Sequence, residues 1–375
     1  MFALNRLKIA QPGIAIAICL GLLAQPSLSA EPKTENVILL MTDGLRWQEV
    51  FSGAEESLIS AEAGGVKDVE GLRAKFWRDT PEARREALLP FIWGTIGRQG
   101  QLLGNREKGS YGQVTNGMHF SYPGYNETLT GFADPAIDSN DKIPNKNVTV
   151  FEWLNRQDGY HGKVAAFGVW DCFPYIFNRD RCGFYINAGF EPVPGEDKNP
   201  RIAAINELKA NTNPVLGTEP QDSFAIYSAV EYLKENKPRV FFLSLNETDS
   251  WAHAGRYDLY LNGAHKADAG LKLLWETLQS IPQYRDKTSL VLTVDHGRGD
   301  APVDWKSHGQ KIAKSEFIWL AAIGPDTAAL GERTNAEPFT QSQVAATVAA
   351  LLGKDYAGAI PQAAKPIADV LPAKK

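Results

Sequence analysis

The sequence has few cysteines, no excess of basic residues and no long apolar run beyond its first thirty residues. Only three cysteines occur among 375 residues, and the formal net charge at neutral pH is −5. That charge does not favour a nucleic-acid polymer as a partner. Hydrophobic residues make up 43% of the chain and charged residues 22%, as is ordinary for a globular protein. A chain of this length is expected to form one large α/β domain or two smaller ones.

Residues 1–30 are typical of a secretory signal peptide. Arg6 and Lys8 form a short positive region, residues 13–24 are apolar, and small residues follow at Ser29 and Ala30. We expect cleavage near these two residues and export to the periplasm or the extracellular space. An uncleaved membrane anchor is the disfavoured alternative, because the apolar run is short for a transmembrane helix.

Two cysteines, Cys172 and Cys182, remain after removal of that segment. In an exported protein, two cysteines at this spacing are expected to form a disulfide that closes a short loop. The alternative is a pair of buried free thiols, because the sequence does not show whether the two Cα atoms approach closely enough to be bridged.

Five apolar runs are predicted to be buried strands, and polar residues or a turn follow each of them. They span 36–42, 163–169, 239–245, 289–294 and 316–323. Helical patterns occupy 82–98, with a bend or break expected at Pro90, and 150–156, 223–236, 259–281 and 341–352. This alternation predicts an α/β fold, a three-layer α/β/α sandwich around a mostly parallel central sheet.

The domain is expected to span 31–362 as one catalytic unit. Weaker periodicity near 54–80 and 192–220 indicates insertions over the sheet, and 363–375 is expected to be a loose C-terminal tail.

Aspartate and histidine residues gather in short polar motifs after three of these strands. Because the carboxyl ends of parallel strands meet at one edge of a sheet, we expect these side chains to converge. Imidazole nitrogen and carboxylate oxygen suit zinc, with manganese as the alternative. The pattern therefore predicts two divalent metal ions a few ångströms apart. The six candidate ligands are Asp43, Asp249, His253, Asp295, His296 and His308.

A candidate nucleophile, Ser121, lies in the motif NGMHFSYPGYNETLTG. A serine that precedes an aromatic-proline pair and a helix start places its hydroxyl at a helix N-terminus, where free N–H groups favour an anion. A metal ion beside that hydroxyl would lower its pKa. The alternative is a serine that only caps the helix.

Taken together, the motifs resemble the alkaline phosphatase superfamily. The resemblance covers most of the chain as the ordered series NVILLMTDG, SYPGYNETLTG, LNETDSWAH, TVDHG and SHG. It implies a central mixed sheet between helices, two metal ions, and a serine that attacks phosphorus to form a phosphoserine, which water then hydrolyses. By residue, it implies a first metal at Asp249, His253 and His308, and a second at Asp43, Asp295, His296 and Ser121.

The resemblance also narrows the expected chemistry. Asn140 lies where related phosphodiesterases carry an asparagine that hydrogen-bonds a phosphate oxygen. Sulfatases need an arginine where this chain has Tyr125, so formylglycine chemistry is disfavoured. The expected substrate is a small phosphate ester.

A choice between diesters and monoesters depends on positive charge near the phosphate. Some family monoesterases supply it with a Lys-x-Arg pair, where this chain has Trp-Asp-Cys at 170–172. We favour a diesterase over a monoesterase, because the chain offers only scattered substitutes: Arg179, Arg181, Arg298 and Lys306. The remaining alternatives are a sulfatase-like activity, a phosphoryl or phosphoethanolamine transferase, and a binding protein without turnover.

Overall fold

An eight-stranded sheet organises residues 32–372, the part of the chain that the computed structural model describes. Its strand order is β10-β2-β9-β7-β1-β6-β4-β5. The strands are β1 (Asn36–Thr42), β2 (Gln101–Leu103), β4 (Val164–Gly168), β5 (Tyr185–Ala188), β6 (Val240–Leu245), β7 (Thr288–Thr293), β9 (Leu320–Ile323) and β10 (Gly331–Glu332). The candidate signal peptide lies outside the described residues.

The centre of the sheet is parallel. β1 pairs in parallel with β6 on one side and β7 on the other, and β4 and β5 continue the parallel order. β9 runs antiparallel to β7 and to β2. The apolar residues of β1 are fully buried because helices cover both faces of the strand, as the continuous apolar run predicted. The α/β fold with a mostly parallel central sheet is therefore confirmed.

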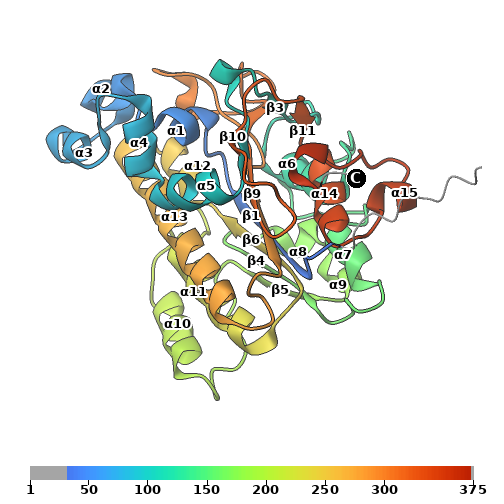
Figure 1. The fold of residues 1–375 in the computed structure, drawn as a ribbon. Helices are drawn as coiled ribbons and strands as arrows, with labels where there is room; N and C mark the ends of the chain where they lie inside the picture. The colour runs from blue at the N-terminus through green and yellow to red at the C-terminus, as the bar shows by residue number, and fades with distance from the viewer. Residues whose placement is uncertain (1–31, 373–375) are drawn as a thin grey trace, which may run out of the picture. The chain divides into compact units, whose positions relative to one another are not determined.

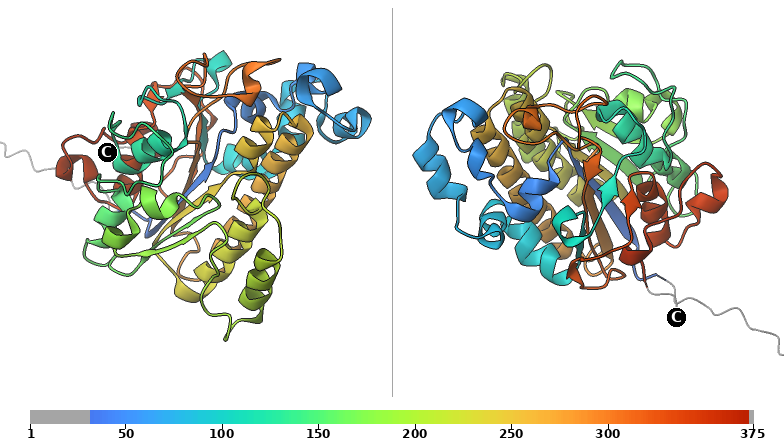
Figure 2. Two further views of the ribbon diagram at one scale, coloured as in Figure 1. Left: turned by 180° about the vertical axis from the view of Figure 1, so that it is seen from behind. Right: turned by 90° about the horizontal axis from the view of Figure 1, so that it is seen from above.

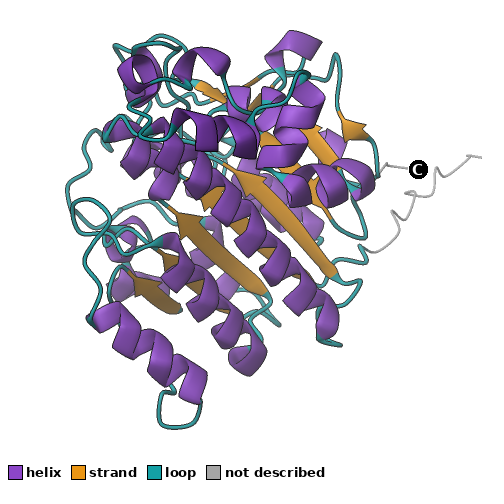
Figure 3. Ribbon diagram, turned by 90° about the vertical axis from the view of Figure 1, so that its left-hand side faces the viewer, coloured by secondary structure: helices purple, strands orange, loops and turns teal. Residues whose placement is uncertain are grey.

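Two helical layers enclose the sheet (Figures 1 and 2). One layer contains α11 (Asp222–Asn236), α12 (Glu247–His253) and α13 (Tyr257–Ser280); Figure 3 shows long helices lying over the strands on this side of the sheet. The other contains α6 (Ser121–Thr130), α7 (Val150–Asn155) and α14 (Gln343–Leu351). Within residues 32–372, no helix is both long and apolar enough to cross a membrane.

The predicted helix over 82–98 is broken at Pro90, as expected. α4 (Pro81–Leu88) ends just before it, and a π-helical segment, η2 (Ile92–Ile96), continues the chain into α5 (Gly97–Gln99). Proline lacks the N–H that a continuous helix needs. The carboxylate of Asp268 accepts hydrogen bonds of 2.8 Å from the N–H groups of both Phe91 and Ile92, and these bonds start the second segment.

The predicted strand over 316–323 is divided between two sheets. β8 (Phe317–Ile318) joins β3 (Gly112–Gln113) and β11 (Phe339–Thr340) in a small three-stranded sheet, whereas β9 belongs to the large one. Trp319 stands between them, and its indole N–H donates to the carbonyl of Leu45 over 2.9 Å. This anchor at the end of β1 separates the two strands.

The regions expected to be insertions contain short helices. Residues 54–80 include η1 (Glu56–Leu58), α2 (Ala61–Gly64) and α3 (Val69–Phe76), and residues 192–220 include α10 (Pro200–Ala210). The expected loose tail, as far as residue 372, is instead packed. η5 (Ala368–Val370) buries Val370, whose carbonyl accepts a hydrogen bond from Thr327.

The expected disulfide is absent, so that prediction is wrong. Cys172 and Cys182 are both free and buried. Cys172 directly precedes α8 (Phe173–Ile176) and its sulfur faces the carbonyl of Asn140, whereas Cys182 ends α9 (Arg179–Cys182) and its sulfur faces the carbonyls of Arg179 and Phe184. The two thiols therefore point toward different parts of the backbone.

Candidate metal centre

Three neighbouring parallel strands, β7, β1 and β6, bring the predicted ligands to one edge of the sheet. Asp43 directly follows β1, α12 directly follows the end of β6, and Asp295 follows β7. His308 comes from the loop after η4 (Asp304–Lys306). The six residues form two groups of three, and the ligand atoms within each group lie within 4.8 Å of one another.

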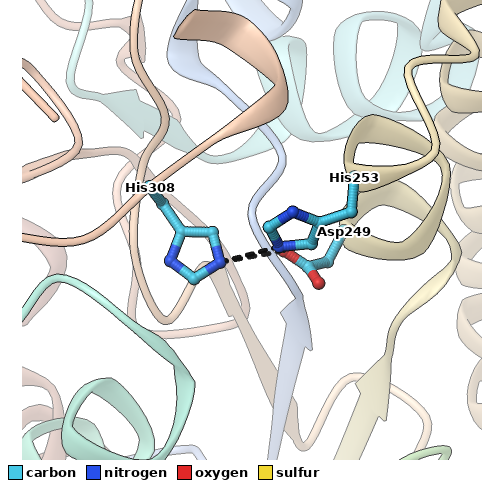
Figure 4. Close-up of side chains that lie close together, drawn as sticks. All are labelled: Asp249, His253 and His308. Atoms are coloured by element: carbon cyan, nitrogen blue, oxygen red, sulfur yellow. Dashed lines mark hydrogen bonds and ion pairs between the residues drawn. The ribbon is translucent and has the colours of Figure 1, made fainter. Parts of the chain in front are cut away.

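The first group consists of Asp249, His253 and His308 (Figure 4). Asp249 and His253 are one turn apart on α12, so both point from the same face of the helix. Oδ1 of Asp249 lies 3.4 Å from Nε2 of His253 and 3.6 Å from Nε2 of His308. The two imidazole Nε2 atoms are 2.9 Å apart. One oxygen and two nitrogens thus face a common point, as ligands of a small cation would.

The second group consists of Asp43, Asp295 and His296, and all three side chains are buried. Nε2 of His296 lies 3.4 Å from Oδ1 of Asp43 and 3.3 Å from Oδ2 of Asp295. These three atoms are buried, and none has a hydrogen-bond partner among the described residues. Because buried polar atoms are normally satisfied, three such atoms facing one another fit a bound cation.

The other nitrogen of each ring supports this reading for two of the histidines. Nδ1 of His296 bonds the carbonyl of Gly297 over 2.9 Å, and Nδ1 of His308 bonds the carbonyl of His119 over 3.0 Å. A carbonyl can only accept, so Nδ1 carries the proton and Nε2 keeps its lone pair. Such a hydrogen bond also fixes the ring orientation of a metal ligand.

A ring stack joins the two groups. The imidazoles of His296 and His308 lie with their centroids 3.8 Å apart and their planes 18° from parallel. Burial, followed by the neighbouring His296, lowers the pKa of His308 to about 2. His308 is therefore neutral at physiological pH, as metal ligation requires.

The three carboxylates at this edge of the sheet lie close enough together to shift one another's pKa. Burial, and then the neighbouring Asp249, raises the pKa of Asp43 well above its usual range, and burial with the charge of Asp43 does the same for Asp295. Burial also opposes ionisation of Asp249, but the guanidinium of Arg298 together with His253 and His308 outweighs it, and the pKa of Asp249 falls well below its usual range. The carboxylates of the second group thus repel one another, and a divalent cation bound between them would relieve that repulsion.

Ser121 is the first residue of α6 and is nearly buried. The same face of α6 carries Gly124 and Tyr125. A Cβ on Gly124 would lie 2.2 Å from the carbonyl oxygen of Asp295, so only glycine permits this approach of the helix to the second group. The N-terminus of α6 therefore begins beside the second group.

The loop before α6 is anchored by Glu127, a buried residue of the same helix. Its carboxylate accepts hydrogen bonds from the N–H and hydroxyl of Thr115, the N–H and amide of Asn116, and the N–H and hydroxyl of Ser342. These bonds hold residues 115–116 and the start of α14 against α6. The sequence motif contained Glu127, but nothing in its spacing indicated this role.

Asn140 lies next to the start of α6. Its Oδ1 accepts a hydrogen bond of 2.9 Å from the N–H of Tyr122, which leaves its amide nitrogen to donate, and the side chain is exposed. Asn140 therefore lies beside the first turn of α6, and its contact with a phosphate oxygen stays a prediction.

Three of the four expected positive charges are held by carboxylates. Arg179 pairs with Glu191, Arg181 with Glu152, and Arg298 with Asp249. The fourth, Lys306, packs against Gly255, two residues after His253: its Nζ would lie 3.8 Å from a Cβ on that glycine. At 170–172, Asp171 forms a 2.7 Å ion pair with Lys142.

No family model matches the sequence, and no curated protein matches it significantly. Solved structures do match. The wild-type alkaline phosphatase PafA aligns at 12% identity with a TM-score of 0.57, over 91% of this chain and 99% of that one. The lipoteichoic acid synthase LtaP from Listeria monocytogenes aligns at 14% identity and 0.54, over 92% and 77%. Murine ectonucleotide pyrophosphatase/phosphodiesterase 5, solved with AMP, aligns at 12% identity and 0.52, over 86% and 96%.

These proteins share an architecture with the chain at very low identity. The chain has the fold of the alkaline phosphatase superfamily, as its motifs indicated. It also has two adjacent groups of candidate metal ligands at the edge where the motifs placed them.

Proposed function

We propose that this protein hydrolyses phosphate esters, with Ser121 as the nucleophile and two divalent cations held by the two ligand groups. The observation that carries the proposal is the pair of Asp/His groups joined by the His296–His308 stack, with the first turn of α6 packed against Asp295 of the second group. The donor set of imidazole nitrogen and carboxylate oxygen favours zinc, with manganese as the alternative. When bound, the cations would supply Lewis acidity and neutralise oxygen charge.

In this mechanism the chain binds and orients the reactants. The hydroxyl of Ser121 loses its proton to solvent and attacks phosphorus in line, the bond to the leaving alkoxide breaks, and the alkoxide takes a proton from solvent. The product on the enzyme is a phosphoserine, which with a diester substrate still carries the second ester group. The N-terminus of α6 and the amide of Asn140 hold the non-bridging oxygens, where negative charge develops. Water then attacks the phosphoserine, which releases the phosphate product and returns the serine.

We propose a preference for diesters over monoesters. A monoester dianion needs more positive charge on its oxygens than a diester monoanion does. Two of the four candidate cations, Arg179 and Arg181, are neutralised by glutamates, and Asp171 occupies the region where monoesterases carry a cationic pair. Lys306 remains as one positive charge near Gly255, two residues after His253.

A three-substrate comparison tests this. Purified protein, supplied with zinc or manganese, is assayed with bis-p-nitrophenyl phosphate, p-nitrophenyl phosphate and p-nitrophenyl sulfate, with and without chelator, and its metal content is measured by elemental analysis. We expect two metal ions per chain, the highest kcat/KM on the diester, and loss of activity with chelator. A preference for the monoester or the sulfate would replace the diesterase assignment, and background rates on all three would favour a binding protein.

The transferase alternative shares the same serine. Its support is the likeness to a lipoteichoic acid synthase fold. Addition of an acceptor alcohol such as glycerol separates the two: a transferase forms the glycerol phosphate product, whereas a hydrolase releases product at a rate independent of glycerol.

We also propose export to the periplasm or the extracellular space, on the pattern of residues 1–30. N-terminal sequencing of protein from the medium or periplasm should begin near residue 30 or 31. Retention of the intact N-terminus in a membrane fraction would instead support an anchor.

A further inference from the structure

Arg298 places a positive charge inside the candidate metal centre. It is two residues beyond His296, and its side chain is fully buried. Its Nη2 donates to Oδ1 and to the backbone carbonyl of Asp249. Its Nε and Nη1 are buried and have no hydrogen-bond partner among the described residues. Burial of a guanidinium with one carboxylate partner costs desolvation free energy, so its presence here points to a role.

The turn after β1 is built around this guanidinium. Gly44 has a left-handed φ of 58°, and a Cβ on it would lie 2.8 Å from Nε of Arg298 and 3.3 Å from Oδ1 of Asp249. The N–H of Gly44 donates to Oδ1 of Asp295 over 3.1 Å. Gly44 therefore contacts both ligand groups and packs over the guanidinium of Arg298, and this packing holds Arg298 in place.

In the part of the chain that the structure describes, Arg298 hydrogen-bonds a residue of the first group but none of the second. Oδ1 of Asp249 bonds Arg298 and is also the oxygen that faces Nε2 of both histidines in the first group. In this arrangement a cation in that group would share this oxygen with the guanidinium and lie close to its charge. In the second group, Oδ1 of Asp43 and Oδ2 of Asp295 remain free, and Arg298 hydrogen-bonds neither residue within the described part of the chain.

We infer that Arg298 makes the two metal sites unequal: the first group binds its cation weakly and exchangeably, and the second binds tightly. In the metal-free protein, Arg298 is the resident cation that compensates Asp249 and keeps the carboxylates together. Arg298 is thus a positioning residue that acts through Asp249. This inference rests on the two-cation part of the proposed function.

Zinc titration of the metal-free protein against a competing chromophoric chelator tests the inference. We expect two binding steps in the wild-type protein, separated by at least about tenfold in affinity. His253→Ala should remove the weaker step and His296→Ala the tighter one, which assigns each step to its group.

Two substitutions separate the charge of Arg298 from its hydrogen bond. Arg298→Gln removes the charge and keeps a donor, and it should strengthen the weaker step at least about tenfold, because a cation no longer lies beside the metal. Arg298→Lys keeps the charge and should preserve two separated steps. Arg85→Gln is the matched control, because Arg85 is a buried arginine paired with Glu332 away from both groups, and it should leave both steps unchanged.

Thermal unfolding gives a second readout. In chelator, Arg298→Gln should melt several degrees below the wild-type protein, and zinc should raise its Tm by more than it raises that of the wild type. Two equal affinities in the wild-type protein, or weaker zinc binding by the first group in Arg298→Gln than in the wild type, would overturn the role of Arg298. Neither result would overturn the proposed function. Absence of zinc binding to the wild-type protein would overturn the proposed function itself.

Discussion

The hydroxyl of Tyr125 donates a hydrogen bond of 3.1 Å to Oδ2 of Asp43. Ser121 lies one helical turn before Tyr125, on the same face of α6. The same hydroxyl also contacts that of Ser244, at 2.8 Å, on the neighbouring β6. One side chain therefore ties the candidate nucleophile helix, a candidate metal ligand and the sheet together, and it sets the position of Ser121 relative to the second group.

Removal of the Ser121 hydroxyl should abolish turnover without loss of metal. Ser121→Ala is expected to lower kcat/KM by at least about 10³-fold, because no other group can form the phosphoserine. Metal content by elemental analysis should stay at two ions, since the six Asp and His ligands are unchanged. Ser139→Ala, in the loop beside Asn140, is the matched control and should keep most of the activity.

Two further observations would decide the role of Ser121. Acid quenching during turnover of wild-type protein should trap phosphate on the peptide that contains residue 121. Activity of Ser121→Ala within about tenfold of the wild type would exclude this serine as the nucleophile.

The amide of Asn140 should act on the transition state more than on metal binding. Asn140→Ala is expected to lower kcat by roughly 10²-fold, the effect of losing one preorganised donor. Asn140→Asp keeps an acceptor for the N–H of Tyr122 but replaces the donor with a negative charge, so a larger loss is expected. An effect on KM alone, with kcat unchanged, would contradict transition-state stabilisation by this amide.

The close approach of α6 to Asp295 should be intolerant of any side chain at Gly124. Gly124→Ala places a Cβ 2.2 Å from the carbonyl of Asp295, and the helix must move away. We expect a loss of about 1–3 kcal/mol in the free energy of unfolding and weaker metal binding. Chemical denaturation and metal titration measure the two effects.

Gly94 is the matched control for this substitution. An added Cβ there meets nothing within 4 Å, and Gly94 lies inside the π-helical segment η2. Gly94→Ala should therefore leave metal binding unchanged and alter stability by no more than about 1 kcal/mol. Equal behaviour of the two variants would show that contact with Asp295 does not matter.

The sequence predicted the centre of the fold well because the central strands are buried on both faces. β1, β4, β6 and β7 are continuous apolar runs, and polar chemistry begins where each of them ends. The short strands β2 and β10 were not predicted, since two or three residues carry no readable period. β8 and β9 were merged because Trp319, which separates them, is itself apolar.

The gathering of the candidate ligands at one edge of the sheet was predictable because the carboxyl ends of adjacent parallel strands must meet. The partners of those ligands were not predicted. The bond from Tyr125 to Asp43 spans 82 positions and that from Arg298 to Asp249 spans 49, and neither leaves a local pattern. The disulfide prediction was wrong for a related reason: cysteine spacing does not show which way two thiols point when one precedes and the other ends a pair of short helices.

A buried acid pair beneath α12 should make stability depend on pH. Oδ1 of Asp222 accepts the N–H of Asn246 over 2.7 Å and that of Glu247 over 3.2 Å, at the start of the helix that carries Asp249 and His253. Burial, and then the charge of Glu247, raises the pKa of Asp222 from 3.8 to about 8. Because the folded protein holds this proton more tightly than the unfolded chain, the stability it contributes is complete below about pH 4 and is lost as the pH rises to about 8.

Asp222→Asn tests this dependence, because an asparagine oxygen can accept the same two N–H groups and cannot ionise. The Tm of the variant relative to wild type should rise steadily between pH 5 and about pH 8 and level off above it, since only the wild type loses the contribution of the protonated acid. Taking the difference in Tm between the two proteins removes the effect of the metal ligands, because these residues titrate in both proteins. Asp197→Asn, at an exposed loop position, should show a flat difference over the same range. A flat difference for Asp222→Asn as well would mean that Asp222 is ionised in the folded protein, and that α12 is held by a charged carboxylate instead of a protonated one.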